Sequence, residues 1–182
     1  MFKNKARHKK LSRQLCENRN RFYKLAYSWS GDSMLADDLV QDATQKALAS
    51  FDSLKDDSKL QAWTCQIMLN CYRDWLRRRK ETLDIDELSL ISNSDPQREL
   101  SSADTTQFVR NCIRQLSENH RNVITLVDLM EFSYEEVSLS LDIPVGTVMS
   151  RLCRGRAQLK LLLADRPPSQ TSAANPGLRR VK

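Results

Sequence analysis

The sequence predicts an all-α protein with two small helical domains joined by an acidic linker. Glycine is rare, with four residues among 182, and apolar residues recur at spacings of three and four rather than in alternation. No apolar run approaches the roughly 20 residues that cross a bilayer. The basic N-terminus lacks the apolar core of a secretory signal, so a cytoplasmic location is expected.

The sign of the charge changes along the chain. Net charge is +6 with a pI near 9.2, which permits binding to a polyanion. Residues 1–21 hold eight Lys and Arg against one acid, and residues 73–80 hold five against one. Residues 81–104 hold seven acids against one Arg. This pattern indicates two polyanion-binding domains joined by an acidic linker.

The sequence predicts neither a metal site nor another cofactor. Its five cysteines are scattered and odd in number, and neither His8 nor His120 has a cysteine at ligand spacing, so reduced thiols are expected. No cluster resembles a nucleophile with its base or a phosphate-binding glycine loop. We therefore predict no catalytic residue and no small-molecule substrate.

Three helices are predicted in the first domain, after a polar, basic and frayed stretch at 1–10. The first covers 11–29 and ends at a Gly31–Asp32 turn, and the second covers 34–51. One face of the second helix is acid-rich, which suits either a solvated surface or a docking face for a basic partner. Composition alone favours the solvated surface.

The third helix, over 60–80, follows a polar loop at 52–59. Its apolar side chains fall on one side, and amides and arginines fall in a narrow arc on the other. That arc fits nucleic acid better than plain exposure, although a basic amphipathic helix without a ligand remains the alternative. The residues of the arc are Gln66, Asn70, Arg73 and Arg77.

The second domain is expected over 105–165. A linker with a short helical piece at 85–91 precedes it, and a disordered tail at 166–182 follows it. A stripe of apolar residues predicts a helix before Leu116, and another helix is expected from a cap at Ser117. Gly155 inside the last helix is expected to weaken that helix by roughly 1 kcal/mol relative to Ala.

The stretch 133–156 has the pattern of a helix-turn-helix. Ser133 is a candidate cap for a helix with two acids in its first turn, and Pro144 separates this helix from a second one. The second helix has apolar residues on one side and short hydroxyls and arginines on the other. These polar residues reach bases and phosphates in a major groove, although a surface hairpin with a solvated basic face is the alternative.

In these motifs the chain resembles an extracytoplasmic-function sigma factor of bacterial RNA polymerase. The resemblance is carried by LADDLVQDATQKAL (35–48), QAWTCQIMLNCYRDWLRRRK (61–80), LSENHRNVITL (116–126) and FSYEEVSLSLDIPVGTVMSRLCRGRAQL (132–159). It covers about residues 11–162. Two independent motifs in the expected order make it specific, whereas a lone helix-turn-helix would fit many repressors.

The resemblance implies a role for each face. Residues 11–80 would be sigma region 2 and residues 105–165 region 4, with core polymerase (its clamp coiled coil and flap) and promoter DNA as partners. The loop at 52–59 would hold a base flipped out of the −10 element, although no single loop residue can be named as its pocket. The implied contacts with the clamp are Asp37, Asp38, Leu39, Gln41 and Asp42; those with the −10 element are Trp63, Asn70, Arg73, Asp74 and Arg77; those with the −35 element are Pro144, Thr147, Ser150, Arg151 and Arg154.

The resemblance also implies that the acidic linker mimics RNA in the exit channel. Relatives are often held inactive by an anti-sigma protein, so the resemblance implies an anti-sigma factor as a further partner. No residue pattern in this sequence indicates one. Three positions depart from the family pattern: Met149 replaces a basic residue, Asp142 a turn glycine and Gly155 an alanine. Met149 therefore leaves the −35 preference open.

Two other functions compete with a promoter-specificity subunit. A stand-alone helix-turn-helix regulator would bind DNA as a dimer without polymerase and would not need Asp38 or Gln41. Alternatively, residues 11–80 form a protein-interaction module, and Arg73 and Arg77 then have no part in strand opening.

Overall fold

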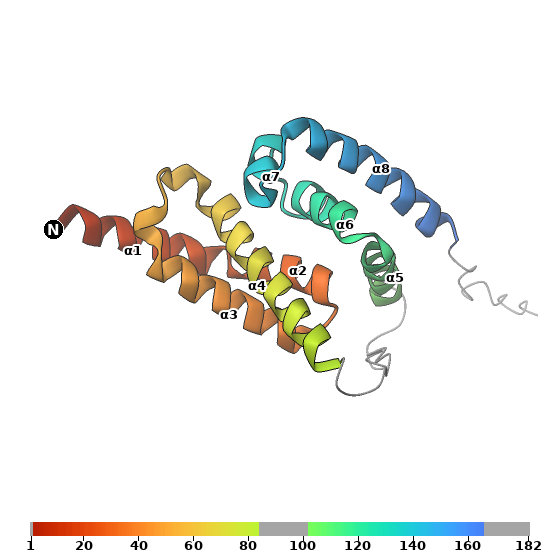
Figure 1. Ribbon diagram of the computed structural model, residues 1–182, viewed down its shortest axis with the longest axis horizontal. Coiled ribbons are helices and arrows are strands. Elements are labelled where there is room, and N and C mark those ends of the chain that lie inside the picture. Colours follow the sequence, from red (N-terminus) through yellow and green to blue (C-terminus); the bar gives the residue numbers. More distant parts are fainter. Residues whose placement is uncertain (1, 84–101, 166–182) are drawn as a thin grey trace, which may run out of the picture.

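The computed structural model describes residues 2–83 and 102–165, and the regular elements within these ranges are helical, as the all-α prediction requires. The predicted linker helix at 85–91 and the tail at 166–182 lie outside the described residues. Figure 1 shows two helical halves lying against each other. The first half consists of α1 (Phe2–Glu17), α2 (Arg19–Ser30), α3 (Ser33–Ala49), two 3-10 turns (Phe51–Ser53 and Asp57–Lys59) and α4 (Leu60–Leu83). The second consists of α5 (Ser102–Gln115), α6 (Glu118–Ile124), a π-helical turn (Thr125–Leu129), α7 (Tyr134–Leu141) and α8 (Val145–Ala164).

The N-terminal segment differs from its prediction. Residues 2–10 are helical rather than frayed, and the predicted helix over 11–29 is interrupted at Asn18. The Asn18 side-chain amide donates to the Gln14 carbonyl at 2.8 Å, a local bond of the kind that competes with regular helix. Helix α1 packs against α2 and α3, and Leu11 is fully buried. The prediction of a frayed stretch is therefore wrong for residues 2–10, which extend the helix that buries Leu11.

The turn between α2 and α3 follows its prediction. Gly31 ends α2 in the left-handed region with φ 69°, and its N–H donates to the Tyr27 carbonyl. Asp32 caps α3 by accepting from the backbone N–H groups of Met34 at 2.8 Å and Leu35 at 3.1 Å. This turn sets α3 beside α2, and α4 then packs on α3.

Helix α8 runs through Gly155 without a break to Ala164. Gly155 is buried where α8 crosses α6. A Cβ atom there would lie 2.9 Å from Ile124 Cδ1 and 3.1 Å from His120 Cβ. The missing side chain permits the two helices to approach closely, so packing offsets the lower helix propensity of glycine.

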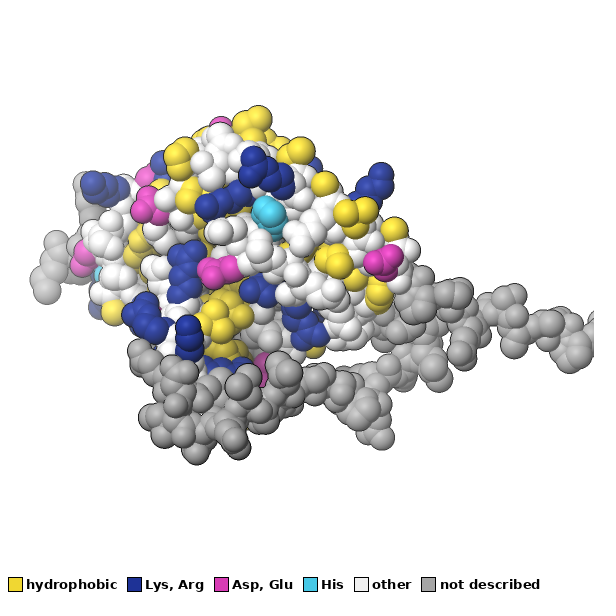
Figure 2. Space-filling model, turned by 45° about the vertical axis from the view of Figure 1, so that its right-hand side comes forward, with side chains coloured by type: hydrophobic (Ala, Val, Ile, Leu, Met, Phe, Trp, Pro, Cys, Tyr) yellow, Lys and Arg dark blue, Asp and Glu magenta, His cyan; other side chains and the backbone are white. Residues whose placement is uncertain are grey.

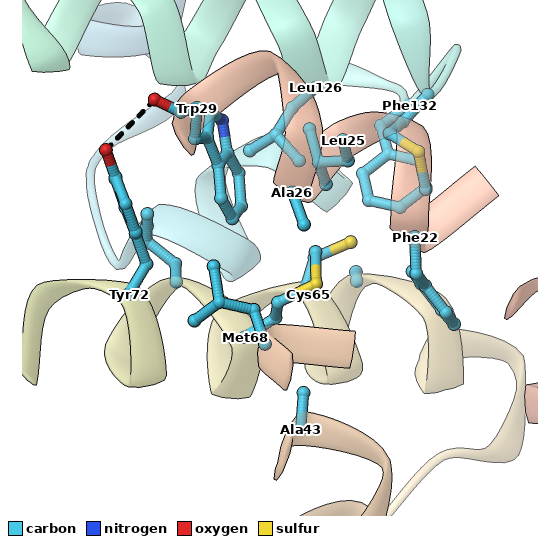
Figure 3. Packing of buried hydrophobic residues seen from close by; sticks show 14 of the residues in the cluster. Phe22, Leu25, Ala26, Trp29, Ala43, Cys65, Met68, Tyr72, Leu126 and Phe132 are labelled. Atoms are coloured by element: carbon cyan, nitrogen blue, oxygen red, sulfur yellow. Dashed lines mark hydrogen bonds between the residues drawn. The ribbon is translucent and has the colours of Figure 1, made fainter. Parts of the chain in front are cut away.

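The two halves share one hydrophobic core. Figure 3 shows Leu126 and Phe132 of the second half pointing into the same space as Leu25 and Trp29 of α2. The Trp29 indole Nε1 donates across this boundary to Thr125 Oγ1 at 3.0 Å. The sequence predicted two helical bodies but not that they pack against each other.

Candidate nucleic-acid interface

The helix-turn-helix is built from local capping. Ser133 accepts from the Glu136 N–H at 3.2 Å, and the Glu136 carboxylate accepts from the Ser133 N–H at 2.8 Å, which completes a capping box. Asp142 ends α7 in the left-handed region with φ 53°. Pro144 then stands at the N-cap of α8, one residue before the predicted first turn. The sequence prediction of both helices and their turn is confirmed.

The outer face of α8 is open to solvent. Val148 and Leu152 anchor the helix in the core, so the opposite side faces outward. Within the described part of the chain, neither Arg151 nor Arg154 has an ion-pair partner. Met149 is 53% exposed on the flank of this face. Of the predicted −35 contacts, Pro144, Ser150 and Arg154 are exposed, and Thr147 and Arg151 are half-buried.

The arginines of α4 differ from those of α8, because two of them form ion pairs. Arg73 Nε lies 3.0 Å from Glu118 Oε1 on α6, and Arg77 Nη2 lies 3.1 Å from Asp74 Oδ1. Asn70 is exposed. Trp63 is half-buried, with its ring centroid 6.4 Å from that of Phe51. The structure thus brings the predicted −10 residues onto one helix, with two of its guanidinium groups already paired.

Basic side chains are spread over one face of the molecule. Figure 2 shows Lys and Arg side chains over the face turned forward, with scattered Asp and Glu among them. Arg156 of α8 pairs with Asp128, and hydrogen bonding to that carboxylate raises the pKa of Arg156. The surface therefore suits a polyanion, although part of its positive charge is compensated locally.

The loop at 52–59 is held by contacts that the sequence analysis missed. Asp56 accepts from the Ser58 N–H at 3.0 Å and the Ser58 hydroxyl at 2.7 Å, and these bonds lower the pKa of Asp56. Arg7 of α1 donates to Asp57 Oδ1 at 2.8 Å and to the Leu54 carbonyl at 2.5 Å. Nothing in the local pattern links Arg7 to a loop about 50 residues away.

His8 adds a second contact from α1 to the loop. Its Nε2 lies 3.1 Å from Asp52 Oδ1, and its ring meets the edge of Phe51 with centroids 5.5 Å apart. Together with Arg7, it fixes both ends of the loop to α1. The loop is therefore a supported structure rather than a free connection.

The acid-rich face of α3 lies beside a groove. The groove, of about 280 Å³, separates α3 from α4, and Asp38, Gln41 and Asp42 line it together with Trp75. Leu39 is 3% exposed and reaches only the floor of this groove, because the helical period that turns its acidic neighbours outward turns Leu39 inward. Exposed Asp37 accepts from Arg19 at 2.7 Å.

The cysteine thiols are not joined in disulfides. All five cysteines are free, and Cys65, Cys71 and Cys112 are buried. Burial raises the pKa of Cys65, with Arg21 lowering it and Glu136 raising it further. Within residues 2–83 and 102–165 no group of three or more His, Cys, Asp or Glu could hold a metal ion. No helix in the same ranges has the length and apolarity to cross a membrane.

Two family descriptions match the chain in the order of its two halves. Sigma-70 region 2 matches residues 16–82, and Sigma-70 region 4 matches residues 109–159. The ECF RNA polymerase sigma factor EcfG of Rhodopseudomonas palustris is 34% identical over 139 residues, which is 76% of each chain. The ECF RNA polymerase sigma-E factor of Escherichia coli is 35% identical over 142 residues, covering 71% of this chain and 73% of the relative.

Solved structures agree with this division. The sigma factor RpoE in complex with the anti-sigma factor NepR from Bartonella quintana matches with a TM-score of 0.76 and 32% identity, covering 87% of this chain and 99% of that one. CnrH in complex with the cytosolic domain of CnrY matches with a TM-score of 0.65 and 25% identity, covering 86% and 89%. A stand-alone regulator is not favoured, because both sigma regions are present. The chain belongs to the extracytoplasmic-function sigma factors, the non-catalytic DNA-binding subunits that direct RNA polymerase to promoters and initiate transcription.

Proposed function

We propose that three faces of this chain divide the work of promoter recognition. The acid-rich face of α3 binds core polymerase, the loop at 52–59 with α4 binds the opened −10 element, and α8 reads the −35 element as duplex. The observation that carries this proposal is the presence of three faces of different chemistry on three helices of one chain. The chain itself performs no catalysis.

The proposed polymerase contact rests on shape and charge. Asp38, Gln41 and Asp42 lie along the edge of the groove between α3 and α4, and their side chains are exposed. A basic coiled coil, such as the clamp of polymerase, would be attracted to these carboxylates and would cover the groove. Leu39 would support the groove floor rather than meet the partner directly.

The proposed −10 contact combines a held loop with a cationic helix. An unstacked base gains a pocket and its strand gains guanidinium contacts, which together offset the energy of opening the duplex. Arg7 and His8 hold the loop in place before DNA arrives. Asn70, Arg73 and Arg77 then lie along the path that the strand would follow on α4.

The proposed −35 contact is a helix in a major groove. Arg151 and Arg154 are available for guanine edges or phosphates, and Ser150 and Thr147 are short enough to allow close approach. Met149 offers an apolar surface, which would favour contact with a thymine methyl group over contact with a phosphate. This residue would shift the −35 preference from that of relatives with a basic side chain.

We also propose an anti-sigma protein as a partner. The support is the likeness to two chains solved with bound proteins, namely RpoE with the anti-sigma factor NepR and CnrH with the cytosolic domain of CnrY. A chain that acts with core polymerase and promoter DNA, the other proposed partners, would work in the cytoplasm at the nucleoid.

Charge reversal on α3 tests the division of work. In a reconstituted run-off assay with core polymerase, omission of the chain should abolish the promoter-specific transcript. Asp38→Arg should reduce polymerase binding and transcription together, while binding to isolated −35 duplex stays unchanged. Glu17→Arg, on the exposed side of α1, is the matched charge reversal that should leave all three unchanged. Full activity of the Asp38→Arg protein would overturn the assignment of α3.

A further inference from the structure

We propose that the first turns of α1 determine which base the loop at 52–59 accepts, because Arg7 and His8 fix the shape of that loop without contacting DNA themselves. This role rests on the proposed −10 contact. It goes further by assigning part of the promoter selectivity to residues that lie before both matched sigma regions. The match to Sigma-70 region 2 begins at residue 16, after the residues of α1 that contact the loop.

The start of α1 lies at the same end of the first half as the loop that joins α3 to α4 (Figure 1). Three apolar side chains anchor the loop in the core, since Phe51, Leu54 and Leu60 are each buried. Between Leu54 and Leu60 no side chain is buried. The segment 55–59 therefore depends on polar contacts to hold one conformation, because apolar burial does not offset the entropy of ordering it.

Arg7 supplies polar contacts to this segment from outside it. Its Nε donates to Asp57 Oδ1 at 2.8 Å, and its Nη2 donates to the Leu54 carbonyl at 2.5 Å. One guanidinium thus bridges the residue before the segment and a residue within it. Within the described ranges, no other side chain distant in sequence hydrogen-bonds to the segment. Arg7 is therefore the tertiary brace of residues 55–59.

His8 holds the other end of the loop. Its Nε2 lies 3.1 Å from Asp52 Oδ1, and its ring meets the edge of Phe51 with centroids 5.5 Å apart. Phe51 in turn lies against Trp63, with ring centroids 6.4 Å apart. Trp63 is among the proposed −10 contacts. His8 is thus connected through one buried ring to a side chain that would meet the strand.

Charge gives α1 a second effect on the loop. Residues 52–59 carry three Asp against two Lys, so the loop alone would repel the phosphates of a strand. Residues 1–10 carry five Lys and Arg and no acid. The Arg7 and Asp57 side chains are 27% and 34% exposed, so their ion pair adds little to global stability. Its main effect is to orient the loop and offset a carboxylate.

Base selectivity should be sensitive to this orientation. A flipped base is selected by stacking and by hydrogen bonds to its edge, so selectivity depends on where the groups of the pocket lie. Binding sites need these groups held within about 0.5 Å of the productive geometry. Loss of the brace should therefore reduce discrimination between bases while the fold of the chain stays intact.

Selection of promoter sequences by the holoenzyme tests this role. Core polymerase with the full-length chain is mixed with promoter duplexes carrying randomised −10 and −35 elements, and the DNA retained in open complexes is sequenced. The parent chain should enrich a single base at one or more −10 positions. Arg7→Met should lower that enrichment about fivefold and His8→Gln about twofold, with the −35 preference unchanged. Arg13→Met is the matched control, since this α1 cation pairs with Glu17 instead, and it should change neither preference.

Hydrogen exchange separates positioning of the loop from a general loss of structure. In the free Arg7→Met chain, the amides of 55–59 should exchange at least about threefold faster than in the parent, while those of buried α3 and α4 keep their rates. Arg7→Lys keeps the charge but lacks the planar fork that bridges two acceptors. It should therefore restore only part of the lost base enrichment.

Three results would overturn the role of α1. They are parental base enrichment in both Arg7→Met and His8→Gln, full recovery in Arg7→Lys, and a loss of affinity that is equal for all bases. The last result, with a smaller salt dependence, would make Arg7 a phosphate contact. A parent holoenzyme that enriches no base in the −10 element would instead contradict the proposed −10 contact itself.

Discussion

The two faces proposed to contact DNA differ in how their arginines are held. On α8, Arg151 and Arg154 have no ion-pair partner among the described residues, and the helix is rigidly anchored through Val148. On α4, Arg73 and Arg77 are each paired with a carboxylate. We relate this difference between the arginines to the DNA that each helix is proposed to bind. Duplex DNA is always present to be read, whereas a free single-strand site would also bind unrelated strands.

The largest expected effect comes from loosening the core between the halves. Leu126→Ala removes a buried side chain at their boundary and should lower the free energy of unfolding by about 2–5 kcal/mol. Chemical denaturation followed by circular dichroism measures the loss. Leu161→Ala, at a position 70% exposed, should change stability by less than about 0.5 kcal/mol. Equal effects of the two substitutions would contradict the shared core.

The next effect sharpens the description of the α8 face. Arg151→Ala should weaken binding to −35 duplex by about 1–3 kcal/mol if the guanidinium contacts a base edge, and it should relax sequence preference at one position. Fluorescence anisotropy with a set of single-base variants measures both. Arg156→Ala is the control, since Arg156 lies on the same helix, pairs with Asp128 and is not among the proposed −35 contacts. A lower salt dependence without any change in preference would make Arg151 a phosphate contact.

The two glycines of α8 provide a paired test of how that helix is supported. Gly155→Val should destabilise the chain by about 1–3 kcal/mol, because the added atoms meet Ile124 and His120. Apart from its chain neighbours and the backbone of its own helix, no described atom lies within 4 Å of a Cβ at Gly146, so Gly146→Ala should be neutral or stabilising by up to about 1 kcal/mol. Thermal unfolding of both variants measures the difference. A Gly155→Val protein as stable as the parent would contradict the close approach of α6 and α8.

The smallest effect concerns the loop beside α4. Hydrogen bonds from Ser58 lower the pKa of Asp56 below its ordinary value of 3.8. The stabilisation from the ionised cap is therefore fully present above that value and is lost as the pH falls through the lower, folded-state pKa. The Ser58 amide resonance should therefore titrate with a midpoint below 3.8. A shift centred above 3.8 would show that the cap is absent.

Local signals made much of the second half predictable. The capping box at Ser133, the left-handed Asp142 and the break at Pro144 depend on residues within a few positions of one another. The acid-rich face predicted for the second helix is likewise the exposed face of α3, whereas Leu39, grouped with these acids by the family resemblance, is buried. Such features follow from short-range geometry, which a sequence displays directly.

Long-range packing was not predictable in the same way. The Arg73–Glu118 ion pair joins residues 45 positions apart, and the bond from Arg21 to the Met130 carbonyl joins residues 109 apart. Neither pair has a local pattern that marks it. The close approach of Gly155 to Ile124 of α6 was hidden for the same reason, since the sequence displays only the low helix propensity of glycine.

Permanganate footprinting of thymines in the −10 element tests the central division of work most directly. With core polymerase and a matched promoter, the parent chain should make these thymines reactive. The double substitution Arg73→Ala and Arg77→Ala should abolish this reactivity while the footprint over the −35 element persists. Undiminished strand opening by the double variant would contradict the account, since α4 would then have no part in opening the promoter.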